Sequence, residues 1–231
     1  MNDGILGPIL ELIATGAIGF LSIMFVVVRK RLVKWFTDDL MPKLNKTPHK
    51  KLKITDIENA TKIREILIEL RILTKSDRSC VFQFHNGSVF TTKNPIWKLS
   101  NTHESVAPGV SSEIGHLQDI KASSVIECIQ SLWTDKICKG FEVLYPEGVS
   151  NTKRAIFSKI SELEDSYSKS LMIEHGITYT IRAPIHSVTN NCVGFVTLNY
   201  CGEQDESKIK GHADVLCRNV AQIQFLLLEG E

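Results

Sequence analysis

An apolar run of 24 residues, from Ile5 to Val28, constrains this chain more than any other feature, because only Glu11 interrupts it. As a helix, a segment of that length reaches about 36 Å, enough to cross a hydrocarbon core of about 30 Å with some tilt. A basic cluster follows directly: Arg29, Lys30, Arg31 and Lys34. Since Lys and Arg are retained on the cytoplasmic side, the pattern predicts a single-pass anchor in the plasma or inner membrane, with residues 29–231 in the cytoplasm.

Two other interpretations of the run remain open, a cleaved signal peptide and a buried helix of a soluble protein. A signal peptide has a positively charged start and a shorter apolar core, whereas this chain begins Met-Asn-Asp. The retained anchor is therefore favoured. Trp35 and Phe36 would lie at the headgroup level, where aromatic rings are enriched, so the anchor and its interfacial extension are assigned to residues 1–36.

Polar and small residues share one side of the expected membrane helix, at spacings of four, four and three: Glu11, Thr15, Gly19 and Ser22. Small residues allow two helices to approach closely, and polar residues can form hydrogen bonds between them. An ionisable residue within a membrane is costly and is a functional candidate by default. The stripe therefore predicts a homo-oligomer, although Glu11 could instead reach the interface or be protonated.

Charge is distributed unevenly along the chain. Residues 29–53 carry nine Lys and Arg against Asp38 and Asp39, a net charge of +7, whereas residues 1–28 carry −2 and residues 54–231 carry −4, which sums to +1. The basic stretch predicts anionic lipid headgroups as a partner, and residues 37–54 are assigned to a basic linker. The mildly acidic remainder argues against a nucleic-acid partner.

The remaining sequence predicts an α+β domain with an antiparallel sheet flanked by helices. Its first helix begins at the capping box Thr55–Glu58 and ends near Leu73. Asn86-Gly87 favours a tight turn, and Gly176 favours the end of a helix. The other expected elements are strands at Cys80–His85, Trp97–Ser105, 141–144, Thr178–His186 and Cys192–Tyr200, and helices at Ser124–Cys138, Ile156–Glu174 and Glu206–Leu228.

Several short segments resemble GAF domains. Residues 174–177, 182–185 and 193–198 resemble the C-terminal half of that family, and residues 77–87 resemble the first strand of bacterial and phage GAF-like domains that ends in Phe-His-Asn-Gly. The resemblance covers roughly residues 55–231. It implies an antiparallel sheet of five or six strands, with a ligand pocket on one face and the first and last helices on the other. It also implies a sensory or dimerisation module, without identifying a ligand or cofactor.

Candidate ligand-binding residues come from two expected strands. His85 and Asn86 would lie at the mouth of a pocket, joined by Asn101, His103 and Glu104, because imidazole, amide and carboxylate groups together can hold a polar ligand. The alternative is that Asn86-Gly87 is turn chemistry, with His85 fixing the turn.

Metal binding and thiol chemistry are both disfavoured by the sequence. His85, His103, Glu104, Glu113 and His116 have suitable ligand types, but their spacing matches no metal template, so no metal site is predicted. A thiol redox enzyme would require an exposed cysteine of low pKa with a resolving partner. Cys80 and Cys192 lie in apolar strand patterns, and only Cys201, at a strand end, has a suitable position. No catalytic residues are predicted.

The sequence therefore predicts a membrane-anchored, cytoplasmic GAF-like regulatory module that self-associates and binds a small ligand or an unknown protein partner. The alternative is a ligand-free interaction protein at the inner membrane, encoded by a phage for example.

Overall fold

The computed structural model describes residues 28–31, 34, 53–89, 95–134, 136–146 and 154–228. The chain divides into two compact units, Met1–Leu52 and Lys53–Glu231. In the first unit the described residues are helical and exposed. Within the described ranges, no helix is long and apolar enough to cross a membrane. Of residues 1–36, assigned to the anchor and its extension, only 28–31 and 34 are described, and the linker is described only from Lys53 onward. The anchor and the linker therefore stay predictions.

The second unit is built on one antiparallel sheet of seven strands, in the order β3-β2-β1-β7-β6-β5-β4. This confirms the predicted α+β class, with more strands than the five or six expected, because β3 and β4 are short additions at its edges. The strands are β1 (Arg78–Val89), β2 (Pro95–Val106), β3 (Ile120–Lys121), β4 (Phe141–Leu144), β5 (Ala155–Lys159), β6 (Ile177–His186) and β7 (Cys192–Cys201).

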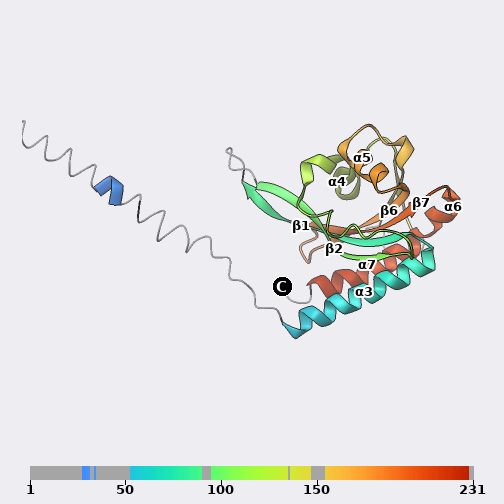
Figure 1. Cartoon of the computed structure of the whole chain (residues 1–231), viewed down its shortest axis with the longest axis horizontal. Coiled ribbons are helices and arrows are strands. Elements are labelled where there is room, and N and C mark those ends of the chain that lie inside the picture. The colour runs from blue at the N-terminus through green and yellow to red at the C-terminus, as the bar shows by residue number, and fades with distance from the viewer. Residues whose placement is uncertain are drawn as a thin grey trace, which may run out of the picture. The chain divides into compact units, whose positions relative to one another are not determined.

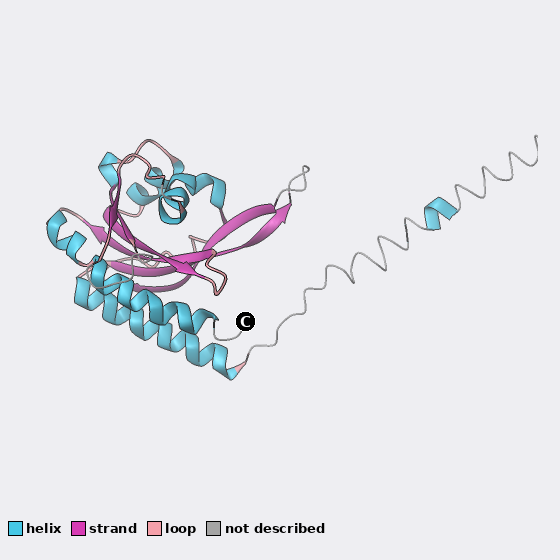
Figure 2. Cartoon of the chain, turned by 180° about the vertical axis from the view of Figure 1, so that it is seen from behind, coloured by secondary structure: helices cyan, strands magenta, loops and turns pink. Residues whose placement is uncertain are grey.

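Helices cover both faces of the sheet (Figure 1). The long helices α3 and α7 lie on one face and α4 and α5 on the other, as the view from behind also shows (Figure 2). The helical elements are α3 (Ile54–Thr74), the 3₁₀ turn η2 (Ala122–Val125), α4 (Ile126–Trp133), the 3₁₀ turn η3 (Ile160–Glu162), α5 (Tyr167–Glu174), α6 (Glu206–Gly211) and α7 (Ala213–Leu228).

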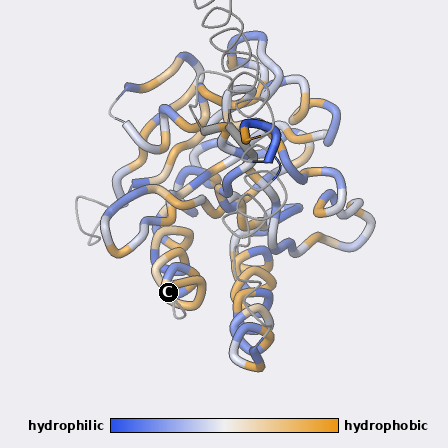
Figure 3. The backbone as a smooth tube through the Cα atoms, turned by 90° about the vertical axis from the view of Figure 1, so that its left-hand side faces the viewer, coloured by the Kyte–Doolittle hydropathy of each residue, from blue (hydrophilic) through white to orange (hydrophobic). Residues whose placement is uncertain are grey.

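The face covered by α3 and α7, here called the α3–α7 face, carries the larger apolar core. Alternate residues of β6 and β7 point into it because side chains of a strand alternate between the two faces of a sheet. Both helices alternate hydrophobic and hydrophilic residues along their length, so each buries one stripe (Figure 3). The core includes Ile63, Leu67 and Leu70 of α3, Ile181 and Ile185 of β6, Val196 and Leu198 of β7, and Leu216, Val220 and Ile223 of α7.

The opposite face, here called the cavity face, has a smaller apolar cluster interrupted by polar side chains. Its apolar residues include Phe82 of β1, Leu99 of β2, Phe195 of β7, and Cys128 and Leu132 of α4. The buried polar residues on the same side of the strands include Arg78, Ser158, Thr180, Arg182, Thr197 and Asn199. The first and last helices lie opposite this face, which agrees with the arrangement that the resemblance implied.

The predicted helix at Ile156–Glu174 was wrong over its first half. Ala155–Lys159 form strand β5, paired with both β4 and β6, and only Tyr167–Glu174 are α-helical. A short apolar run cannot be assigned to helix or strand by periodicity alone, and here burial on both sides of the sheet decides for a strand. Gly176, at φ +68°, ends the helical stretch as predicted.

The predicted turn at Asn86-Gly87 was also wrong. β1 continues to Val89, with Asn86 opposite Trp97 and Ser88 opposite Ile96, and the register shift between them marks a bulge. Gly87 instead allows β1 to lie close to β2 at this bulge, since a Cβ there would lie 2.9 Å from the Ile96 carbonyl oxygen.

Three helix boundaries also differ from the predictions. The first helix begins at Ile54, where the Asp56 carboxylate accepts from the Lys53 N–H at 2.9 Å, so Asp56 rather than Thr55 provides the cap. The helix expected to reach Cys138 ends at Trp133. The last helix is interrupted at His212, whose Nδ1 lies 2.8 Å from the Tyr200 hydroxyl.

Candidate functional site: a small cavity beside Arg182

A cavity of about 70 Å³ lies between the cavity face of the sheet and the layer that contains α4 and α5. Its volume corresponds to a few water molecules or a small group of non-hydrogen atoms. Most of its wall is apolar, with a few polar side chains. The lining residues are Phe82, Leu99, Leu117, Ile120, Val125, Cys128, Ser168, Leu171, Met172, His175, Ile177, Arg182, Phe195, Thr197 and Asn199.

Strand register places the polar part of this wall at the centre of the sheet. Arg182 of β6 lies opposite Thr197 of β7, and Thr180 lies opposite Asn199. The Thr180 and Thr197 hydroxyls lie 3.0 Å apart, and the Thr197 hydroxyl donates to Asn199 Oδ1 at 2.9 Å. These hydrogen bonds fix the side chains in place without using the Arg182 guanidinium.

Arg182 is a buried cation, with only 5% of the residue exposed. One terminal nitrogen donates to Ser158 Oγ at 3.4 Å and the other to Met172 Sδ at 3.1 Å. Among the described residues, no carboxylate oxygen lies within 4.0 Å of the guanidinium. Buried charges are normally paired, because burial without a partner costs several kcal/mol. Arg182 therefore places at the cavity a positive charge that has no direct carboxylate partner among the described residues.

His175, which follows α5 and also lines the cavity, belongs to a buried ionic network. Its Nδ1 lies 3.3 Å from Glu113 Oε2, and Glu113 Oε1 lies 3.8 Å from a terminal nitrogen of Arg78. Arg78 also donates to the His175 carbonyl oxygen at 3.1 Å. His175 Nε2 is buried and has no hydrogen-bond partner among the described residues. The network thus joins the sheet, α5 and the segment 107–119, and leaves one buried ring nitrogen of a cavity-lining residue without a partner.

None of the five predicted ligand-binding residues lines the cavity. His85 and Asn86 lie near the outer end of β1, where His85 Nε2 is 2.9 Å from Ser100 Oγ. The same Ser100 oxygen accepts from the Asp119 backbone N–H at 2.9 Å, so His85 contributes to an edge contact between β1, β2 and the segment 107–119.

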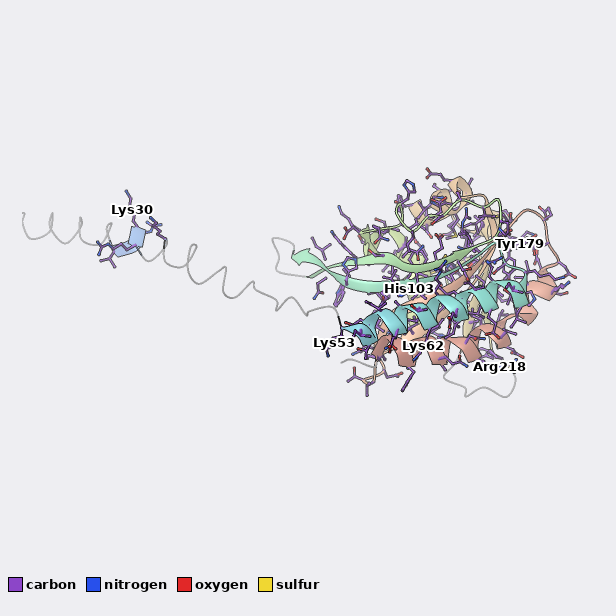
Figure 4. All side chains as sticks on the ribbon, turned by 60° about the horizontal axis from the view of Figure 1, so that its bottom comes forward. Lys30, Lys53, Lys62, His103, Tyr179 and Arg218 are labelled. Atoms are coloured by element: carbon purple, nitrogen blue, oxygen red, sulfur yellow. The ribbon has the colours of Figure 1, made fainter. Side chains whose placement is uncertain are left out.

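Glu104 and His103 point to opposite faces, so the expected shared pocket does not form. His103 lies opposite Val81, a residue of the α3–α7 core, and lies beside α3 (Figure 4). Burial lowers the pKa of His103. The Glu104 carboxylate instead accepts from the backbone N–H groups of Glu113 and Ile114, at 3.0 and 3.2 Å. Glu104 therefore anchors the segment 107–119 over the cavity face.

Asn101 is the predicted residue placed nearest the cavity wall, since it lies opposite Phe82 on the cavity face of β2. It is 1% exposed, and neither atom of its side-chain amide reaches a hydrogen-bond partner among the described residues. Its backbone N–H donates to the Leu117 carbonyl at 2.8 Å. Asn101 thus joins Glu104 in holding the segment 107–119.

The predicted oligomerisation residues Glu11, Thr15, Gly19 and Ser22 lie outside the described residues. The predicted headgroup contacts are described, and Arg29, Lys30, Arg31 and Lys34 are helical and exposed.

The cysteines and acidic residues give no support to redox or metal chemistry. Burial raises the pKa of Cys80 well above its ordinary value, with nearby Glu104 adding to the effect, and raises the pKa of Cys192 to about 11. Burial also raises the pKa of Cys201. These shifts oppose the formation of a reactive thiolate. The part of the chain that the structure describes has no group of three or more His, Cys, Asp or Glu residues placed to hold a metal ion.

The sequence reasoning missed Arg182 and His175 as site residues. A usable signal was present, because Thr180, Arg182, Thr197 and Asn199 are polar residues at alternate positions in two otherwise apolar strands. Alternate positions share one face, so two neighbouring strands of this kind place a polar patch on a buried sheet.

Comparison with known proteins finds no matching family model and no matching curated protein. Solved structures with a similar fold include several that are described as GAF domains. One is a phycoerythrobilin-bound GAF domain from a cyanobacterial phytochrome, with 15% identity over 73% of this chain and 86% of that chain, at a TM-score of 0.46. The structure of a far-red cyanobacteriochrome photoreceptor has 12% identity over 87% of this chain and 96% of that chain, at a TM-score of 0.45.

A third similar structure is the PixJ GAF domain of Thermosynechococcus elongatus in its blue-light absorbing form. It has 12% identity over 76% of this chain and 91% of that chain, with a TM-score of 0.41. At these identities and scores, the similar structures do not indicate what this chain binds.

Proposed function

We propose that residues 53–228 form a GAF-like regulatory module that binds a small ligand in the cavity between the sheet and α5. The single observation that carries this proposal is a cavity lined by Arg182, a buried cation without a carboxylate within 4.0 Å among the described residues, and by His175. Ligand sites are typically apolar hollows with a few polar groups that fix orientation, and this cavity has that character.

The contacts around His175 provide a route from ligand binding to a structural response. A ligand that contacts His175 would change its interaction with Glu113, and Glu113 belongs to the segment 107–119, which Glu104 also holds. Binding would therefore order or release α5 and this segment together. The proposal places the signal in association or partner binding, since a ligand shifts a conformational equilibrium only through different affinities for the two states.

The membrane anchor at residues 1–36 and its basic extension form part of the same proposal. They would hold the module beside anionic lipid, with self-association through the membrane helix. Support for this part comes from the sequence pattern and from the exposure of the basic cluster.

Hydrogen–deuterium exchange on the full chain tests the ligand-binding proposal. Small metabolites that raise the unfolding midpoint should also slow exchange in α5 and in residues 107–119. Arg218→Met on the surface of α7 serves as a control variant that should respond as the unaltered chain does. Protection confined to other segments for every stabilising ligand would contradict the proposal.

A second candidate function, a protein-interaction surface, is favoured by exposed apolar residues on α3 and α7. An open groove between these helices is lined by Lys62, Glu65, Ile66, Glu69, Ala221, Gln222, Phe225 and Leu226. Phe225, which lines the groove, is 64% exposed, and Ile57, Ile72 and Leu73 of α3 are exposed outside it. Exposed apolar residues rimmed by polar ones often mark an association site.

Sedimentation of the full chain in detergent tests this candidate. Phe225→Glu should lower the association state if the groove is an interface. Tyr145→Glu is the control and should not, because Tyr145 is a similarly exposed aromatic that follows the edge strand β4 and does not line the groove. Unchanged association for both variants would remove the groove from consideration.

A further inference from the structure

We propose that the ligand of this cavity is a short-chain aliphatic carboxylate, held by Arg182 and His175. This inference rests on the proposed ligand-binding function and specifies the chemical class of its ligand. It is carried by three independent features of the cavity: its charge, its unused hydrogen-bonding groups and its size.

Charge complementarity favours an anion. The Arg182 guanidinium is buried and lines the cavity, and no described carboxylate lies within 4.0 Å of it. A ligand carboxylate would supply the missing negative charge. Arg also presents paired N–H donors in a planar fork that matches the two oxygens of a carboxylate.

Hydrogen-bonding groups at the cavity remain partly unused. A Met sulfur is a weak acceptor, so the contact from Arg182 to Met172 Sδ leaves a strong donor poorly satisfied. His175, which also lines the cavity, has a buried Nε2 without a partner among the described residues, while its Nδ1 lies 3.3 Å from Glu113 Oε2. A ligand carboxylate would satisfy the Arg182 guanidinium first, and a small rotation of the His175 ring would bring its second nitrogen to the same ligand.

Size and wall chemistry restrict the remainder of the ligand. A volume of about 70 Å³ is far below the roughly 300 Å³ at which sites for drug-sized ligands begin, so a nucleotide does not fit. The rest of the wall is apolar, with Phe82, Leu99 and Phe195 among its residues. A carboxylate with a chain of a few carbons places its charge on Arg182 and its chain against these residues.

The Glu127 carboxylate of α4 is a group within the protein that would balance the Arg182 charge without a ligand. Its Oε2 is buried and has no hydrogen-bond partner among the described residues, and it does not reach Arg182 within 4.0 Å. A water molecule between the two groups would compensate both charges without any ligand.

Isothermal titration of the full chain tests the inference with butanoate, its neutral isostere butanamide, and inorganic phosphate, all at constant ionic strength. We expect butanoate to bind and butanamide to bind at least about tenfold more weakly, because a hydrogen-bonded charge contact is typically worth a factor of about ten or more. Arg182→Met should abolish butanoate binding, and Arg218→Met should leave it unchanged. Met is suitable here because a well-packed apolar residue can replace a buried charge without loss of folding.

Each contrary outcome is distinguishable. Binding of butanoate and butanamide with equal affinity, insensitive to Arg182→Met, would overturn the carboxylate inference and leave the ligand-binding proposal standing. Tighter binding of phosphate than of butanoate would also overturn it. If Glu127→Gln strengthens butanoate binding by tenfold or more, Glu127 already compensates Arg182 and the inference is wrong. If no compound binds, the inference fails, and the hydrogen-exchange screen described above then decides the ligand-binding function separately.

Discussion

The two faces of the sheet use the same strands for different purposes. On the α3–α7 face, β6 and β7 contribute Ile181, Ile185, Val196 and Leu198 to a continuous apolar core. On the cavity face, the alternate residues of the same strands are Thr180, Arg182, Thr197 and Asn199. Apolar burial stabilises a fold, whereas buried polar groups that lack partners reduce stability and tend to be retained for function. The larger apolar core therefore lies on one face, and the other face carries the buried polar residues to which we assign the proposed ligand binding.

The largest expected effect comes from the α3–α7 core. Leu198→Ala, at a fully buried position, should lower the free energy of unfolding by about 3–5 kcal/mol, because it removes packing contacts and leaves a void. Leu99→Ala on the cavity face should cost less, about 2 kcal/mol, since one side of Leu99 already borders empty space. Urea titrations measure both, and an equal or reversed order would contradict the proposed division between the faces.

Glu113→Gln should have the next largest effect, about 2–4 kcal/mol, because it leaves the Arg78 charge buried without its partner. The matched control is Glu162→Gln, which removes an exposed ion pair with Lys159 and should change stability by less than about 1 kcal/mol. Chemical denaturation gives the two energies. Amide hydrogen exchange in α5 and in residues 107–119 should become faster in Glu113→Gln and stay unchanged in Glu162→Gln. If these segments remain protected in Glu113→Gln as well, the ionic network does not hold them in place.

Close packing of β7 on β1 gives a prediction of intermediate size. A Cβ on Gly194 would lie 2.2 Å from the Phe82 carbonyl oxygen, so Gly194→Ala must displace backbone and should cost about 1–3 kcal/mol. Gly115→Ala is the control, because a Cβ there has no neighbour within 4 Å, and its effect should stay within about 0.5 kcal/mol. Thermal unfolding of the two variants distinguishes them, and similar midpoints would show that β1 and β7 can separate easily.

The smallest expected effect is a pH dependence from partly buried histidines. Burial lowers the pKa of His103, His186 and His212 below the ordinary 6.5. The unfolded chain therefore takes up protons first as the pH falls, and stability that is complete above pH 6.5 declines below it. The midpoint of thermal unfolding should fall as the pH is lowered from 7.5 to 5.5. His103→Gln should make this fall smaller, whereas the control His116→Gln, at an exposed position, should leave it unchanged. A midpoint that rises on acidification would refute this assignment.

Local sequence patterns predicted much of the α3–α7 face correctly. The alternation in Thr178–His186 and Cys192–Tyr200 gave two strands, and the helical spacing from Ile57 to Leu73 gave α3, because each pattern reflects a buried stripe within one element. The Asn86-Gly87 turn failed because residue preference alone does not reveal a bulge inside a longer ribbon, where cross-strand pairing decides.

By itself, the sequence determined which segments could bury a face, and it supplied the basic and apolar N-terminal pattern that predicts an anchor. Tertiary structure alone decided that Ala155–Lys159 form a strand, because pairing with two neighbouring strands overrides local helical spacing. Tertiary structure also determined where the cavity lies and which residues line it. Arg182 and His175 both line it, together with residues of β1, β2 and β7, and packing among segments far apart in the sequence leaves no trace in local periodicity. Whether a cation is paired when buried depends on its three-dimensional neighbours, which only the folded chain defines.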